Sequence, residues 1–351
     1  MKSVYKYFIQ PCNGGAGECV PQYLCDNGKF KTDGSDLIDI RFSANNECGN
    51  YFELCCDIGS VGESTTVNLT LPPPTSCGFR NANGVMMRIT GSENNESEFA
   101  EFPWMVAVLK SQEESSNKLY VCGGSLIHPS VVLTAAHCLS NRNPSIYIVR
   151  AGEWDTHTQN EPFKHSDHEV ADLAVHPEYY RGGLYNDAAL VFLKNEVEFG
   201  PHTGTICLPP QNQNFDRQRC FVSGWGKNKW GDEGAYQAIL KRIEVPVVPH
   251  EDCQTTLRWK QKRDKYQLHE SFICAGGEPD KDSCDGDGGS PLVCEIEGSN
   301  GHFYQAGIVA WGVECGVQGV PGIYANVAKF RSWIDETMDI KRLVSDYYSY
   351  V

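Results

Sequence analysis

The sequence lacks a long apolar run, an excess of basic residues and any internal repeat. No apolar stretch approaches the ~18 residues that span a bilayer, so we do not expect a membrane protein. The 30 Lys and Arg residues are outnumbered by 45 Asp and Glu residues, and the formal charge of -15 argues against nucleic acid as a partner. The opening MKSVYKYFIQ has too short an apolar stretch to be a signal peptide, which leaves either a removed leader or an expression boundary.

Cysteine, by contrast, is abundant, with 16 residues in a chain of 351. The even number fits disulfides formed in an oxidising compartment, so we expect a secreted, extracellular protein. Six of the cysteines fall within residues 12–56, a segment too short to bury enough apolar surface to fold without such bridges. Many pairings are open, but the adjacent Cys55 and Cys56 can hardly pair with each other and need separate partners.

Composition separates this cysteine-rich module, assigned to residues 10–57, from a linker and a larger domain. The linker, residues 58–76, has no cysteine or aromatic residue and contains three consecutive prolines. From residue 89 to the end at 351, short β-branched and aromatic runs punctuated by Gly, Pro and Asn predict a mainly β barrel or sandwich. Apolar residues at helical intervals over 329–350 predict one terminal helix.

Two Asn-X-Ser/Thr triplets are candidate glycosylation sites. One begins at Asn68 in the linker, and the other begins at Asn95 near the start of the larger domain. Both stand in polar segments of a chain that we expect to be secreted, so we expect both to carry glycans.

Three fragments carry candidate catalytic chemistry. LTAAHC places His137 beside a cysteine, YNDAALVFL places Asp187 at the start of an apolar strand, and DSCDGDGGSPLVC covers residues 282–294. In this order, the fragments resemble the chymotrypsin-like serine proteases, whose triad runs His, Asp, Ser along the chain. The resemblance covers about residues 89–340 and includes CGGSLI, VSGWG, ICAGG and VPGIYANV. It implies a trypsin-like domain, residues 89–351, built as a double β-barrel with a C-terminal helix and a cleft between the barrels.

One position of the triad departs from the family. The family's Gly-Asp-Ser-Gly-Gly-Pro signature reads GDGGSP at residues 286–291, so Gly288 stands at the nucleophile position and has no side chain to attack a carbonyl. Ser290 lies roughly 6 to 7 Å further along an extended backbone, too far for activation by His137. A serine that supports the aspartate in active relatives is replaced by Ala310. We therefore interpret the domain as a serine protease homologue, not an enzyme, with the degenerate triad His137, Asp187 and Gly288.

The specificity pocket of trypsin-like relatives is partly retained. Asp282 matches the acid at the base of that pocket, and Gly312 and Gly322 match its small walls. Two interpretations are open: residual binding of a basic side chain, or inherited architecture in which the acid is hydrated or paired internally.

The resemblance also implies a partner for every cysteine. Within the N-terminal module it is to a clip domain, and Cys77 and Cys207 match a bridge that ties a light chain to the protease domain. That bridge makes residues 77–88 a disulfide-tethered connecting segment. The expected bridges are Cys12–Cys55, Cys19–Cys48, Cys25–Cys56, Cys77–Cys207, Cys122–Cys138, Cys220–Cys294, Cys253–Cys274 and Cys284–Cys315.

A clip domain joined to a protease domain without its nucleophile resembles the arthropod clip-domain serine protease homologues of the prophenoloxidase-activating factor II type. The resemblance implies a non-catalytic cofactor in melanisation and innate immunity, present in haemolymph. Its expected partners are prophenoloxidase, an upstream activating clip protease and further copies of the chain. Arg88-Ile89 resembles the family's activation bond. The alternatives are an active trypsin-like protease with an unusual nucleophile, and a decoy that binds protease substrates or inhibitors.

The loop GEWDTHTQNE, residues 152–161, resembles the calcium loop of trypsin-like domains. Its side-chain oxygens suit a hard cation that takes about six to eight oxygen ligands. We expect a structural calcium ion there; the alternative is an ordinary acidic surface turn. The candidate ligands are Glu153, Asp155, Thr158 and Glu161.

Overall fold

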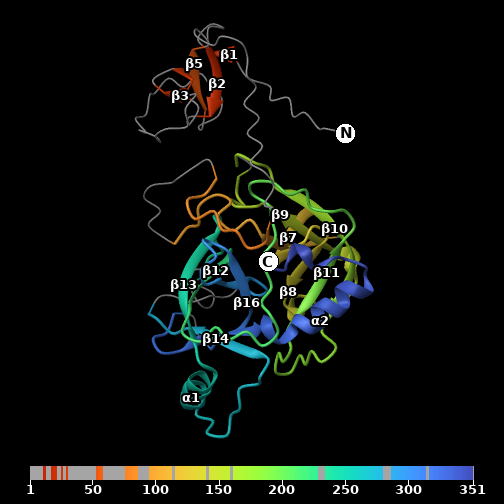
Figure 1. Cartoon of the computed structure of the whole chain (residues 1–351), viewed down its shortest axis with the longest axis vertical. Coiled ribbons are helices and arrows are strands. Elements are labelled where there is room, and N and C mark those ends of the chain that lie inside the picture. Colours follow the sequence, from red (N-terminus) through yellow and green to blue (C-terminus); the bar gives the residue numbers. More distant parts are fainter. Residues whose placement is uncertain are drawn as a thin grey trace. The chain divides into compact units, whose positions relative to one another are not determined.

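The computed structural model describes most of the chain from residue 76 onward and five short strands before it. The described residues are 11–12, 17–21, 25–26, 29–30, 53–57, 76–85, 95–112, 115–139, 142–158, 161–227, 234–279, 286–313 and 316–350. They belong to two compact units, Met1–Leu69 and Thr70–Val351 (Figure 1). No helix in these ranges is long and apolar enough to cross a membrane.

The N-terminal unit contains a sheet of five strands in the order β1-β2-β5-β4-β3. The disulfide Cys12–Cys55 joins β1 to β5, with 5.7 Å between the two Cα atoms. The expected pairs Cys19–Cys48 and Cys25–Cys56 fall outside the residues whose side chains are described. The strands are β1 (Pro11–Cys12), β2 (Gly17–Pro21), β3 (Cys25–Asp26), β4 (Lys29–Phe30) and β5 (Glu53–Asp57).

Six strands of the second unit close into a first barrel in the order β10-β11-β8-β7-β6-β9. Buried and half-buried residues alternate along β9, as expected for a strand with one face toward a barrel interior. β8 and β11 are buried at every position, which fits their nearly continuous apolar sequences VVLT and ALVFL. The strands are β6 (Met105–Gln112), β7 (Ser115–His128), β8 (Val131–Thr134), β9 (Tyr147–Ala151), β10 (Ser166–Val175) and β11 (Ala189–Leu193).

A second barrel follows in the order β12-β13-β14-β17-β16-β15, and the two barrels confirm the mainly β, double-barrel fold. The disulfide Cys220–Cys294 crosses from β12 to β15, where the two cysteines are directly opposite in the register. Helix α1 (His250–Gln261), which the sequence did not predict, is bridged to β14 by Cys253–Cys274. The strands are β12 (Arg219–Gly224), β13 (Lys241–Val248), β14 (Phe272–Gly276), β15 (Pro291–Glu295), β16 (Phe303–Trp311) and β17 (Pro321–Asn326).

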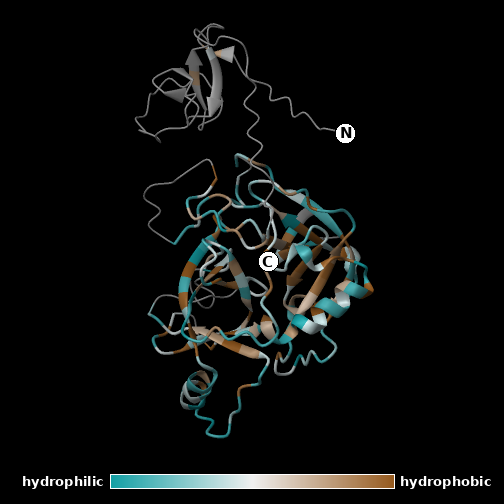
Figure 2. Cartoon of the chain, in the orientation of Figure 1, coloured by the Kyte–Doolittle hydropathy of each residue, from teal (hydrophilic) through white to brown (hydrophobic). Residues whose placement is uncertain are grey.

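The terminal helix is present but shorter than the predicted range 329–350. Helix α2 (Val327–Ile340) ends where Arg342 adopts a left-handed backbone with φ 60°, and a 3-10 turn, η5 (Ser345–Tyr347), follows. The buried side chains Phe330, Ile334 and Met338, four residues apart, pack into the large core cluster formed mainly by the first barrel. Figure 2 shows apolar residues on the barrel strands, where several strands also carry polar residues.

The connecting segment belongs to the second unit, and its described residues, up to residue 85, fasten it to the barrels. The disulfide Cys77–Cys207 is present, and the Arg80 guanidinium lies 4.0 Å from the centroid of the Phe221 ring. Arg80 also pairs with Glu101, whose carboxylate is fully buried. Glycans are expected at two places, of which Asn95 is exposed and Asn68 lies outside the described residues.

Candidate functional site: a histidine–aspartate pair and a cation loop

His137 and Asp187 come together from two connections of the first barrel. His137 lies in the 3-10 turn η3 (Ala136–Cys138) after β8, and the disulfide Cys122–Cys138 holds that turn against β7. The Nδ1 atom of His137 is 2.6 Å from Oδ2 of Asp187, and the backbone N–H of His137 donates to Oδ1 at 2.8 Å. Asp187 is fully buried, so these two contacts orient the ring and direct Nε2 away from the aspartate.

Gly288, in the turn before β15, lies beside Nε2, the ring nitrogen of His137 that does not contact Asp187. A Cβ atom built on Gly288 would lie only 2.8 Å from Nε2 of His137 and 3.3 Å from Cε1. The backbone therefore directs position 288 at the imidazole, as a nucleophile would require. Since the residue is glycine, the histidine faces a backbone and has no hydroxyl to activate at this position.

Ser290 does not replace the missing hydroxyl. Its side chain is fully buried, and a Cβ atom on Gly123 would lie 2.1 Å from the Ser290 Oγ atom. Ser290 therefore fits because Gly123 has no side chain, and none of the hydrogen bonds in the described part of the chain joins it to His137. Ala310 packs in an apolar cluster with Leu184, among other residues, and offers Asp187 no hydrogen bond.

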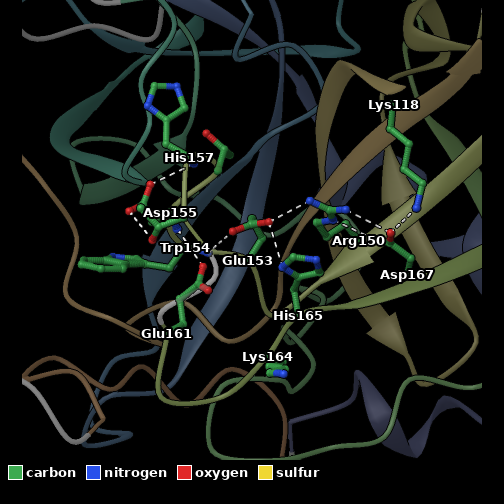
Figure 3. Close-up of polar contacts among 12 residues, drawn as sticks. Lys118, Arg150, Glu153, Trp154, Asp155, His157, Glu161, Lys164, His165 and Asp167 are labelled. Carbon is green, nitrogen blue, oxygen red and sulfur yellow. Dashed lines mark hydrogen bonds and ion pairs between the residues drawn. The ribbon is translucent and has the colours of Figure 1, made fainter. Parts of the chain in front are cut away.

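The acidic loop after β9 brings together two of its four candidate ligands (Figure 3). Glu153 and Glu161 approach each other, and with His165 they can each direct one ligand atom to a common point, all within 4.8 Å of one another. Asp155 and Thr158 instead bond to each other: the Thr158 hydroxyl donates to Oδ2 of Asp155 at 2.9 Å. The side chains of the loop thus form a carboxylate pair and an Asp–Thr pair, and the Asp155 N–H links the two by donating to Oε1 of Glu161 at 3.1 Å.

The carboxyl groups of Glu153 and Glu161 differ in pKa. Burial, together with the neighbouring Glu153 carboxyl, raises the pKa of Glu161 to about 7. Burial also disfavours ionised Glu153, but hydrogen bonds with His165 and Glu161 outweigh burial and lower the pKa of Glu153. Arg150 Nη1 donates to Glu153 at 3.1 Å, and His165 Nδ1 is 3.1 Å from the same oxygen. A divalent cation between the two carboxylates would favour the ionised form of Glu161, which burial and the neighbouring Glu153 disfavour.

Comparison with known proteins identifies the family. Residues 89–334 match the family described as "Trypsin", and residues 6–57 match "Serine protease Clip domain PPAF-2". The chain belongs to the trypsin family. The N-terminal unit is the clip domain that precedes the trypsin-like domain.

Three relatives of this trypsin-family chain carry names of two kinds. "Phenoloxidase-activating factor 2" of Galleria mellonella is 48% identical over 296 residues, covering 80% of this chain and 97% of that protein. "Inactive CLIP domain-containing serine protease A8" of Anopheles gambiae is 37% identical over 337 residues, covering 94% of this chain and 90% of that protein. "Inactive CLIP domain-containing serine protease A28" of the same species is 37% identical over 346 residues, covering 93% and 89%.

Other expected positions of the trypsin-family site are only partly described. Asp282, the bridge Cys284–Cys315 and the bond Arg88-Ile89 lie outside the described residues. Gly322 is buried in β17, whereas Gly312 is exposed and a Cβ atom there would meet nothing within 4 Å. Asp287 is described, and its Oδ1 accepts a hydrogen bond from the Gly226 N–H at 2.8 Å.

Sequence reasoning missed His165 and Arg150, which both contact Glu153. The signal lay in strand pairing: β9 and β10 are antiparallel, with Ala151 opposite Ser166. That register brings the residue before Ser166 next to the residues that follow Ala151, so an imidazole and the two glutamates meet across the turn. Linear spacing within residues 152–161 gave no sign of either contact.

Proposed function

We propose that the protein is a non-catalytic cofactor in an extracellular protease cascade that activates prophenoloxidase, with a role in melanisation and innate immunity. The observation that carries the proposal is the position of Gly288, which faces Nε2 of His137 without a side chain. Two relatives support the two halves of the proposal: one is named phenoloxidase-activating factor 2, and the other is named an inactive CLIP domain-containing serine protease. A chain that retains the scaffold but has no nucleophile acts through binding.

The test is activation of prophenoloxidase by an active clip protease, with and without this protein. We expect phenoloxidase activity to rise when the protein is added, and we expect no labelling by a serine-reactive fluorophosphonate. The His137→Ala variant separates the two classes of function, because an enzyme with an unusual nucleophile needs the imidazole and a cofactor does not. Loss of the effect in that variant would favour the enzyme, and a fall in phenoloxidase activity with the wild-type protein would favour a decoy.

The cofactor is secreted into haemolymph in this proposal, and an upstream clip protease cuts it at Arg88-Ile89. The disulfides of the second unit support an oxidising compartment. Mass spectrometry after exposure to the protease locates the cut, and sedimentation before and after it measures self-association. A single cut at another bond would refute the assignment of Arg88-Ile89.

We also propose that the acidic loop binds a structural calcium ion. The residues fit a hard cation in part: Glu153 and Glu161 supply facing carboxylates, whereas Asp155 and Thr158 must reorient or contribute backbone carbonyls. The ion would stabilise the native state, by about 2.7 kcal/mol at a hundredfold excess over Kd. Thermal unfolding with calcium and with chelator tests this: Glu153→Ala should abolish the difference, and an unchanged difference would reject these ligands.

A further inference from the structure

The end of α1 and the loop after it carry a net positive charge, opposite in sign to that of the whole chain. In a chain with a formal charge of -15, residues 258–265 contain five Lys and Arg residues and one acid, Asp264. Helix α1 projects from the second barrel, at the bottom of Figure 1, so this segment lies at a protruding end of the domain. The five basic residues are Arg258, Lys260, Lys262, Arg263 and Lys265.

The segment presents three of its five basic side chains and one large aromatic ring to solvent. Lys262, Arg263 and Lys265 are exposed, and none of the ion pairs within the described ranges includes them. Trp259, between Arg258 and Lys260 in the sequence, is 79% exposed. Within the described part of the chain, neither the packing of the Trp259 ring nor an ion pair of the three exposed cations accounts for this composition.

The segment is held in place by contacts that do not use the exposed charges. Leu257 is fully buried on the inner side of α1, which the Cys253–Cys274 disulfide fastens to β14. The Lys262 N–H caps the helix from a left-handed conformation, φ 53°. The Arg263 N–H donates to the Arg258 carbonyl at 3.0 Å, and Arg258 Nε donates to the Tyr266 carbonyl at 2.7 Å. The loop is therefore an ordered extension of the helix.

Helix stability explains only part of this composition. Cations near the last turn interact favourably with the helix dipole, which accounts for Arg258 and Lys260. The effect falls off within that turn, so it does not account for Lys262, Arg263 and Lys265, which lie beyond the last residue of the helix. Like charges this close repel one another, and an external anion would remove the repulsion.

The composition of residues 258–265 favours one class of partner over the others. Protein interfaces are depleted in lysine at their core, and three of these five cations are lysines. A membrane-binding helix needs a continuous apolar face, whereas the apolar residues of α1 other than Trp259 are turned inward. Clustered Lys and Arg residues in a disulfide-bonded extracellular chain are typical of sites for anionic polysaccharides. An exposed indole adds a flat apolar face on which a sugar ring can stack.

We propose that residues 258–265 form a binding site for a polyanionic carbohydrate, with its sulfate or phosphate groups on the cations and a sugar ring on Trp259. The net charge of the whole chain does not prevent this, because charges beyond about 8 Å are largely screened at physiological salt. The site is separate from the proposed cofactor role, and its binding is measured without prophenoloxidase.

The experiment measures binding of the full disulfide-bonded protein to immobilised heparin, which carries sulfate, and to immobilised teichoic acid, which carries phosphate. We expect retention on at least one of them, and the comparison identifies the preferred group. With about three anionic groups contacted, one for each exposed cation, raising salt from about 50 to about 200 mM should weaken binding roughly fortyfold, taking the salt dependence of duplex DNA as a guide.

Three variants test the residues. K262A/R263A/K265A should bind at least tenfold more weakly, whereas K110A/R181A/K329A, which removes the same residue types from exposed positions elsewhere, should bind like the wild type. Trp259→Ala should lose several-fold in affinity. Equal binding by the first variant and its control, or no retention of the wild type on either polymer, would overturn the site. Full affinity in the Trp259→Ala variant would overturn its assignment to a carbohydrate.

Discussion

Restoring the nucleophile with Gly288→Ser should produce only weak proteolysis, because the His137 imidazole lies too close to position 288 for an added side chain. The backbone itself accepts serine, since Gly288 is not among the glycines with positive φ. The added Cβ, however, would lie 2.8 Å from Nε2 of His137, closer than side chains normally approach. The imidazole must move, and its 2.6 Å contact with Asp187 opposes that movement.

The expected loss follows from two effects. A displacement approaching 1 Å in a catalytic group can cost about a hundredfold in rate. The missing hydrogen bond at Ala310 costs about 1 kcal/mol, or roughly fivefold. Together they place kcat/KM about 10²- to 10³-fold below that of an active clip protease assayed in parallel. The assay is hydrolysis of an Arg peptide after cleavage at Arg88-Ile89, with Gly288→Ala as the control of similar bulk and no hydroxyl.

Two second-site substitutions, Ala310→Ser and Ser290→Gly, test which groups limit the activity of the Gly288→Ser variant. Adding Ala310→Ser to Gly288→Ser should raise kcat/KM about fivefold, by the hydrogen bond just considered. Adding Ser290→Gly should not raise it, because Ser290 does not have a positive φ and its hydroxyl already fits against Gly123. Activity of the single variant equal to that of the active protease would refute the argument from crowding at the imidazole.

Three further outcomes are expected. The pKa of Glu161 is raised from 4.5 to about 7, so without calcium the folded chain loses stability as pH rises through that interval. The Glu161→Gln variant should therefore have a higher melting temperature than the wild type in chelator at pH 7.5, and a smaller increase in melting temperature on addition of calcium. Glu101→Gln leaves two arginines facing a buried amide and should cost about 3 to 5 kcal/mol in urea unfolding, whereas the exposed Glu244→Gln should cost less than about 1 kcal/mol. Asn95→Gln should lose one glycan, seen as a mass decrease that enzymatic deglycosylation abolishes. A flat pH profile, equal costs for the two glutamates, or an unchanged mass would each contradict the corresponding prediction.

The fold and the histidine–aspartate pair were predictable because their signals are local and strong. Continuous apolar runs mark the buried strands, and the resemblance places His137 and Asp187 in motifs that the barrel brings within 2.6 Å. Helix α1 escaped prediction because only one side of it is buried and its sequence is largely polar. The predicted end of α2 was too late because the left-handed residue after the helix is Arg342, and not the glycine that commonly marks a helix end in a sequence.

The acidic loop was predicted less well because ligand geometry depends on contacts across strands. Asp155 accepts the Thr158 hydroxyl and the His157 N–H, local bonds that compete with any role toward a cation. His165 reaches Glu153 only through the pairing of β9 with β10. Alternating oxygen-bearing residues in the sequence therefore identified the loop and two carboxylates, but not the arrangement of the remaining groups.

The connecting segment is fastened by bonds of two chemical kinds, and this decides how the chain responds to a cut. The Cys77–Cys207 disulfide is sensitive to reductant, whereas the Phe303 N–H to Gly78 carbonyl bond and the pairing of Arg80 with Glu101 are not. Each of these bonds joins a residue before Arg88 to a residue after Ile89, so cleavage between Arg88 and Ile89 would break none of them. Tension applied through the linker would still reach the barrels at residues 77–80, so the cut frees a new terminus without mechanically uncoupling the clip domain.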